Sequence, residues 1–183
     1  MSGHNKWSQI KNKKGVTDAK RSKLFTMLVR QITIEARNAG GNREFPSLKA
    51  AIQRAKVENM PADNIERAVQ KGFGAGADSY EEVIYEAYGP AGVAMIIVGI
   101  TDNKNRTTPE IKHILSNHNG NLGAQGSVMW AFEKKDGKWE AKNLMELSGD
   151  DQEKVLSLIE ELENHDDVKE VFHNAFLDDQ IDD

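Results

Sequence analysis

The pattern of apolar residues changes abruptly at Phe73–Ser79, and this change constrains the fold more than any other feature of the sequence. Before it, apolar residues recur at three- and four-residue spacing, which is typical of amphipathic helices. After it, short apolar runs alternate with turn signals, which is typical of strands. The segment itself, FGAGADS, is rich in small residues and has no periodicity. It therefore predicts a linker at residues 73–79 between a helical domain (1–72) and an α+β domain (80–183).

The first domain is expected to be a bundle of three helices. The first helix runs from residue 17 to the helix-stopping pair Gly40-Gly41. The second is expected to be capped by Ser47 and to end before Pro61, because proline disfavours helical geometry in the residue that precedes it. The third carries Pro61 in its first turn and ends just before Gly72.

The sequence pattern of the second domain predicts the element order β-β-α-β-β-α-β. This order favours helices packed on one face of a mostly antiparallel sheet. Its second strand is apolar on both faces, as expected of a central strand. Thr108-Pro109-Glu110 predicts the start of a helix, and Asp136-Gly137 predicts a hairpin turn. The expected strands are 80–88, 93–101, 127–133, 138–141 and 168–173, and the expected helices are 108–120 and 150–164.

Charge divides the chain at the same place. Residues 1–72 contain 15 basic and 6 acidic residues, whereas residues 73–183 contain 9 basic and 23 acidic residues. This asymmetry predicts two domains with different partners. The acidic domain is expected to offer a surface to a basic partner, such as a ribosomal protein or a polymerase element.

The basic residues gather in the opening segment, GHNKWSQIKNKKGVTDAKRSKLF. Lysines release counterions from phosphates and give sequence-independent affinity for nucleic acid. Trp7 is available to stack on a base, although anchoring the segment to the bundle is an equally good interpretation. The candidate nucleic-acid-binding residues are His4, Lys6, Trp7, Lys11, Lys13, Lys14, Lys20, Arg21, Lys23 and Arg30.

Other functional classes find less support. No pair of histidines stands at metal-ligand spacing, so neither a metal nor a cofactor is expected. The glycine-rich GNLGAQGS lies between a helix and a strand, which is the wrong order for a phosphate-binding loop. An enzyme, the competing hypothesis, would place its site around Asp102, Arg106 and His118, but no nucleophile and base come together there. Without cysteine or a long apolar run, the expected location is the cytoplasm.

The opening segment also resembles the signature of the YebC/PmpR family, in which G-H-S-K-W precedes a basic run and D-x-x-R-x-K-x-F. Asn5 stands where the family usually has serine. The resemblance continues through NMPADNIERAVQKG, YEAYGPAGVA, TDNKNRT, HNGNLGAQGSVMWAFEKK and LIEELENHDDVKEVFHN. These ordered matches cover most of the chain.

The resemblance implies a cytoplasmic regulator of gene expression that binds nucleic acid. Members similar to this chain are described as transcriptional regulators that bind promoter DNA. Relatives that include the mitochondrial translational activator of cytochrome c oxidase act in translation, which leaves an RNA-binding, ribosome-associated factor as the alternative. Family members usually carry a further small domain between FEKK and the acidic C-terminal helix, and this chain resembles a member without it.

Overall fold

The computed structural model describes residues 18–74 and 80–177. The chain divides into two compact units. The helical unit extends through Glu82 and includes Ile100–Lys104, so it contains the ends of two strands. The α+β unit contains Val83–Gly99 and the chain from Asn105 onward.

The helical unit contains three helices, as expected: α2 (Asp18–Ala39), α3 (Pro46–Val57) and α4 (Ala62–Phe73). Their apolar faces meet in one core, with Ile32 and Leu48 fully buried. The expected cap of α3 is wrong. Phe45 precedes the helix, Pro46 occupies its first turn, and the Ser47 hydroxyl donates to Oε2 of Glu35 in α2 instead.

Gly72 was expected just beyond α4, but it lies inside that helix and is buried. A Cβ atom built on Gly72 would lie 2.5 Å from both the Cβ of Ala36 and the carbonyl oxygen of Thr33. The backbones of α2 and α4 therefore approach so closely at this point that only glycine fits. Gly74 follows the helix and caps it, with its N–H bonded to the carbonyl oxygens of Gln70 and Lys71.

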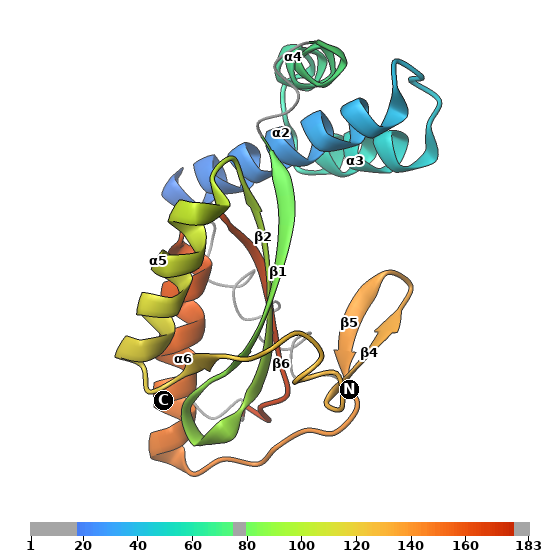
Figure 1. The fold of residues 1–183 in the computed structure, drawn as a ribbon. Helices are drawn as coiled ribbons and strands as arrows, with labels where there is room; N and C mark the ends of the chain where they lie inside the picture. Colours follow the sequence, from blue (N-terminus) through green and yellow to red (C-terminus); the bar gives the residue numbers. More distant parts are fainter. Residues whose placement is uncertain (1–17, 75–79, 178–183) are drawn as a thin grey trace. The chain divides into compact units, whose positions relative to one another are not determined.

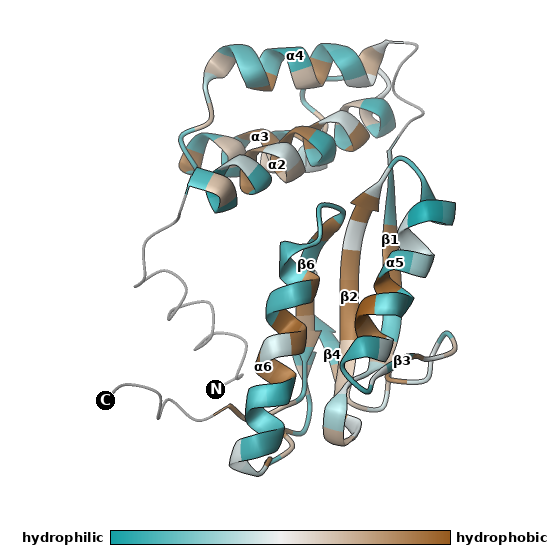
Figure 2. Cartoon of the chain, turned by 90° about the vertical axis from the view of Figure 1, so that its left-hand side faces the viewer, coloured by the Kyte–Doolittle hydropathy of each residue, from teal (hydrophilic) through white to brown (hydrophobic). Residues whose placement is uncertain are grey.

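The α+β unit is built on a four-stranded sheet in the order β3-β1-β2-β6. β1 pairs with β3, and β2 pairs with β6, both in the antiparallel direction. The central strand β2 is buried along its whole length, which confirms its expected place, and Figure 2 shows it largely in the colour of apolar residues. The strands are β1 (Glu81–Tyr88), β2 (Ala94–Thr101), β3 (Asn121–Leu122) and β6 (Val168–His173).

Helices α5 (Lys104–Asn117) and α6 (Gly149–Asn164) cover one face of this sheet (Figure 1). Apolar residues of both helices, among them Ile111 and Leu158, pack on alternate residues of β1 and β2 in a single core. Helix α5 begins four residues earlier than expected, so Pro109 lies inside it and the segment TDNKNR is partly helical. Ser148 caps α6, since its hydroxyl accepts the N–H of Asp151.

The opposite face of the sheet is covered by residues 123–142 (Figure 1). The strand expected at residues 127–133 is wrong in position: residues 125–131 form turns, and β4 (Phe132–Lys135) follows them. β4 pairs with β5 (Lys138–Ala141) in a separate two-stranded sheet. Asp136 and Gly137 form the predicted turn, both at positive φ (49° and 81°), as a two-residue hairpin requires.

No helix in the described ranges is long and apolar enough to cross a membrane.

Candidate nucleic-acid interface

The predicted nucleic-acid-binding residues divide between two parts of the chain. Six of them lie outside the described residues: His4, Lys6, Trp7, Lys11, Lys13 and Lys14. The other four lie on α2: Lys20, Arg21, Lys23 and Arg30.

The first turns of α2 present Lys20 and Arg21 to solvent, and Lys23 is half-buried. The guanidinium of Arg21 lies 5.5 Å from the centre of the Phe25 ring, one helical turn away. Phe25 itself packs against the core of the helical unit. This contact restricts the guanidinium while leaving its donors toward solvent, and a planar guanidinium suits a phosphate group. The N-terminal end of α2 is therefore a cationic surface.

Arg30 is half-buried, unlike Lys20 and Arg21. Its Nη1 donates to the carbonyl oxygen of Ile100 at 2.8 Å, and its guanidinium lies 5.4 Å from the centre of the Tyr80 ring. Arg37, two turns farther along α2, donates to the carbonyl oxygen of Tyr80 at 3.2 Å. These arginines connect α2 to the ends of β1 and β2, so part of the basic charge of the helical unit supports its packing.

Further basic residues of the helical unit lie outside the predicted cluster. Arg54 and Lys56 are exposed in the last turn of α3. Neither has an ion-pair partner among the described residues, whereas Arg43 forms a bidentate pair with Glu66. These residues contribute to the basic charge of residues 1–72 but lie outside the lysine-rich opening segment that predicts the interface.

The three residues of the enzyme hypothesis have different surroundings. Arg106 donates from Nη2 to Oδ2 of the buried Asp167 at 2.7 Å. His118 follows α5, and its Nε2 lies 2.5 Å from Oε2 of Glu161 in α6. Asp102 is exposed beyond the end of β2. Arg106 and His118 thus connect elements of the α+β unit.

One group of side chains has the composition of a metal site. Potential ligand atoms of Glu110, His165 and Asp167 lie within 4.8 Å of one another. The hydrogen bonds among these residues already use those atoms. His165 Nδ1 accepts the N–H of Asp167, His165 Nε2 lies 3.0 Å from Glu110, and Asp167 accepts from both Arg106 and the Thr107 hydroxyl. A cation would have to displace Arg106, so the group fits a network better than a metal centre.

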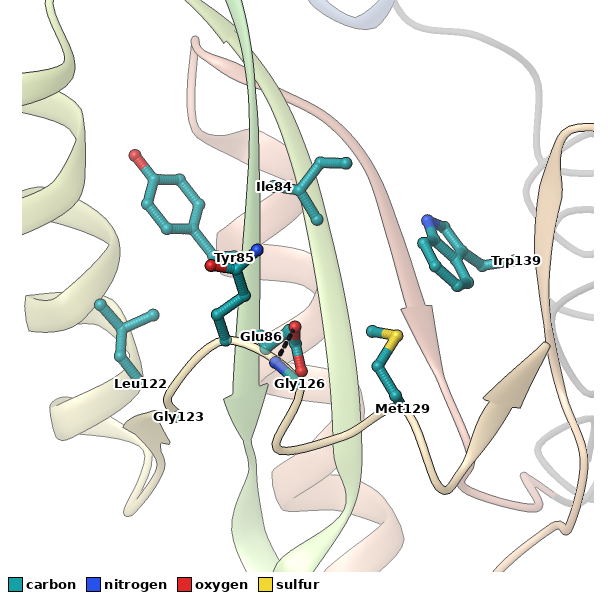
Figure 3. A pocket seen from close by; sticks show the side chains of 9 residues that line it. Ile84, Tyr85, Glu86, Leu122, Gly123, Gly126, Met129 and Trp139 are labelled. Atoms are coloured by element: carbon teal, nitrogen blue, oxygen red, sulfur yellow. Dashed lines mark hydrogen bonds between the residues drawn. The ribbon is translucent and has the colours of Figure 1, made fainter. Parts of the chain in front are cut away.

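The glycine-rich segment GNLGAQGS borders a pocket of about 560 Å³ on the sheet face opposite α5 and α6 (Figure 3). Glu86 of β1, only 8% exposed, accepts the backbone N–H groups of Gly126 and Val128 at 2.6 and 2.9 Å. The glycines thus let the chain fold over a carboxylate. Figure 3 shows Ile84, Met129 and Trp139 around the same space. Sequence reasoning treated this segment only as a turn.

Family models match both units. A model of the TACO1/YebC protein N-terminal domain matches residues 5–75, and a model of the TACO1/YebC second and third domain matches residues 80–137 and 135–175. A protein from Fervidobacterium nodosum named "Probable transcriptional regulatory protein" is 40% identical over 240 residues, covering 98% of this chain and 95% of that protein. A protein of the same name from Syntrophus aciditrophicus is 59% identical over 138 residues, covering 74% of this chain and 55% of that protein.

A solved structure is also similar. The crystal structure of a conserved hypothetical protein from Aquifex aeolicus superposes with a TM-score of 0.80 at 32% identity, covering 90% of this chain and 93% of that one. The alignment with the Fervidobacterium protein is longer than this 183-residue chain, so that relative contains residues with no counterpart here. The two matches of the second family model meet at residues 135–137, which is the tip of the β4–β5 hairpin.

Proposed function

This chain belongs to the TACO1/YebC family, and we propose that it regulates gene expression by binding nucleic acid through its helical unit. The observation that carries the proposal is the charge of that unit. Residues 18–74 contain 11 basic and 6 acidic residues, and Lys20 and Arg21 are exposed together at the start of α2. Such a surface attracts the phosphate backbone whatever the base sequence.

Regulation of transcription is the role that the names of the relatives support. A promoter-specific regulator reads base edges, typically with arginine, asparagine or glutamine side chains. The opening segment instead contains six lysines and two arginines within residues 1–30. Lysine is a point charge suited to phosphates, which favours recognition of backbone and shape. This observation supports the second candidate function, a ribosome-associated translation factor that binds structured RNA.

We further propose that the protein is not an enzyme. Arg106 and His118, two residues of the alternative site, are engaged by Asp167 and Glu161 in contacts that join α5 to its neighbours. These pairs supply no activated nucleophile. A screen for hydrolase and nuclease activity with Asp102→Ala and His118→Ala variants tests this part of the proposal. Activity that either substitution abolishes would contradict it.

The central experiment measures binding of the full chain to duplex DNA and to structured RNA by fluorescence anisotropy at several salt concentrations. We expect affinity to fall steeply with salt for both ligands. The Lys20→Ala/Arg21→Ala variant should bind more weakly, and on duplex DNA the slope of log K against log salt should decrease by about 2 if each residue neutralises one phosphate. Lys112→Ala/Lys154→Ala, which removes the same charge from α5 and α6, is the matched control.

Two outcomes would overturn the proposal: no binding to either ligand, or equal losses in the two double variants. Crosslinking in cells followed by sequencing of both RNA and DNA then separates the two candidate roles. Enrichment of ribosomal RNA supports translation, whereas enrichment of a few promoters with discrimination that survives high salt supports transcription.

A further inference from the structure

The sheet face opposite α5 and α6 carries a second set of features suited to nucleic acid. We define the hairpin face by four apolar or aromatic side chains, which line the pocket or lie in the turn before β4, and by two lysines of the hairpin. Its members are Ile84, Met129, Trp130, Lys134, Lys138 and Trp139.

Trp130 is the most exposed aromatic side chain of the described residues, at 55%. Its position is nevertheless fixed, because its Nε1 donates to the Tyr88 hydroxyl at 3.2 Å and that hydroxyl donates to the carbonyl oxygen of Ser127 at 2.6 Å. A large ring held in place but left in solvent contributes little to the core. It is suited to stack on a planar ligand, since the loss of side-chain freedom has already occurred.

The pocket lies beside Trp130 on the same sheet face. Ile84, 49% exposed, and Tyr88 point to this face because they stand at alternate positions of β1 with Glu86 between them. Ile84 and Tyr88 are four positions apart along the strand, a distance of roughly 13 Å. Trp139 lines the pocket together with Ile84. Trp130 donates a hydrogen bond to Tyr88, at the other end of this stretch of β1. Two of the three tryptophans of the chain are thus spaced along one surface.

Charge separates this surface from the rest of its unit. Residues 134–142 contain four lysines, and elsewhere between residues 80 and 177 acidic residues outnumber basic ones by 16 to 5. Lys134 lies over the Trp139 ring, 5.4 Å from its centre, so a cation borders the aromatic group directly. Lys138 is exposed at the hairpin tip and has no ion-pair partner among the described residues. Lys135 is paired with Glu133 and Glu140 and adds less.

We propose that the hairpin face binds single-stranded nucleic acid, with an unpaired base stacked on Trp130 and phosphates held by Lys134 and Lys138. The inference goes beyond the helical unit but rests on the proposed function, since both contacts serve the same class of ligand. Aromatic rings tolerate any base, and lysines follow the backbone, so binding is insensitive to sequence. A protein partner could also bind an exposed tryptophan, but the lysines favour a polyanion in a unit that is otherwise acidic.

The test uses the full chain and a short oligouridine that carries a single 4-thiouridine, crosslinked by near-ultraviolet light. Digestion and mass spectrometry then identify the crosslinked peptides. We expect crosslinks within residues 129–139 as well as in the helical unit. Crosslinks confined to residues 1–74 would overturn this inference and leave the proposed function standing. No crosslink at all, together with no binding in anisotropy, would overturn both.

Substitutions give an independent readout in the same oligouridine titration. Trp130→Ala should raise Kd at least about fivefold, because a base stacked on an aromatic ring contributes at least that factor. Trp130→Phe should recover part of the loss. Leu144→Ala, which removes another exposed apolar side chain of the unit, is the matched control. Lys138→Glu should weaken binding more than Lys112→Glu, which makes the same charge change on α5.

A duplex of the same length supplies the last comparison. Its bases are not available for stacking, so Trp130→Ala should change duplex binding much less than oligouridine binding. If Trp130→Ala leaves the affinity for oligouridine unchanged, the tryptophan serves another partner, such as a protein, and the inference fails. Circular dichroism verifies that each variant is folded.

Discussion

Arg106 and Asp167 join the start of α5 to the turn before β6 through a 2.7 Å bond between Nη2 and Oδ2. Asp167 is 2% exposed, whereas nearly half of the Arg106 side chain remains in solvent. The same oxygen of Asp167 accepts the hydroxyl of Thr107 at 2.6 Å. A buried carboxylate of this kind is stable because both neighbours donate to it.

Asp167→Ala should therefore lower the free energy of unfolding by about 2–3 kcal/mol, since it leaves the buried Thr107 hydroxyl without this acceptor. Urea denaturation measures the effect. Asp166→Ala, at the exposed neighbouring position, should cost about 0.5 kcal/mol or less. Equal effects of the two substitutions would show that the Asp167 network does not contribute to stability.

The close approach of α2 and α4 gives a second prediction. Gly72→Ala should destabilise the protein by about 1–3 kcal/mol, because the added methyl group overlaps Ala36 and the Thr33 carbonyl. This loss outweighs the gain in helix propensity of about 1 kcal/mol. At Gly74 the nearest atom to an added Cβ is 3.5 Å away, so Gly74→Ala is the control. A Gly72→Ala protein as stable as wild type would contradict the packing described here.

The bidentate pair between Arg43 and Glu66 makes the stability of the helical unit depend on pH. The hydrogen bonds from Arg43, followed by one from Gln70, lower the pKa of Glu66 from its ordinary 4.5 to about 2. A lowered pKa in the folded state means that the pair stabilises fully above pH 4.5 and that the contribution is lost as pH falls toward 2. The difference in melting temperature between wild type and Glu66→Gln should shrink over that range.

Arg43→Ala provides the control for this pH dependence. Without the guanidinium, Glu66→Gln should change the melting temperature little at any pH in the same window. A wild-type difference that does not vary between pH 4.5 and 2 would show that the exposed pair contributes nothing measurable, as many surface pairs do.

The hydrogen bonds of Glu110, His165 and Asp167 predict that metal ions do not change the stability of the protein. Because Arg106 and Thr107 already donate hydrogen bonds to Asp167, we expect neither EDTA nor added Zn²⁺ to change the melting temperature. A rise with Zn²⁺ that His165→Ala abolishes would identify a metal site instead.

Much of the fold follows from periodicity in the sequence. The helices α2 and α6, the buried strand β2 and the turn at Asp136-Gly137 were predicted because each has a strong local signal. The misplaced features depend on contacts made elsewhere in the chain. The local sequence predicts that Gly72 ends a helix. The structure instead requires glycine there because Ala36, 36 residues earlier in the chain, leaves no room for a Cβ atom. Pro109 likewise predicts the start of a helix, although α5 begins at Lys104.

The candidate interface was predictable only in part. A run of lysines identified the N-terminal end of α2, where Lys20 and Arg21 are exposed. Arg30 belongs to the same run, yet the structure places its guanidinium against Ile100 and Tyr80, which no local pattern indicates. No local pattern predicts the hairpin face, since Ile84 and Trp139, which line the same pocket, are brought together only by the packing of strands far apart in the sequence.

The β4–β5 hairpin is a place where the chain can accept added residues without loss of its fold. Its tip lies outside the four-stranded sheet, and the matches to the family model meet there. Lys135 and Lys138 are paired neighbours, so any domain whose own termini are close together can be spliced between them without altering the register of β1, β2 or β6. When nothing is spliced in, Asp136 and Gly137 suffice to reconnect the strands. The turn of the hairpin is therefore a site that tolerates the insertion of a domain. A reporter domain grafted there should leave both units folded.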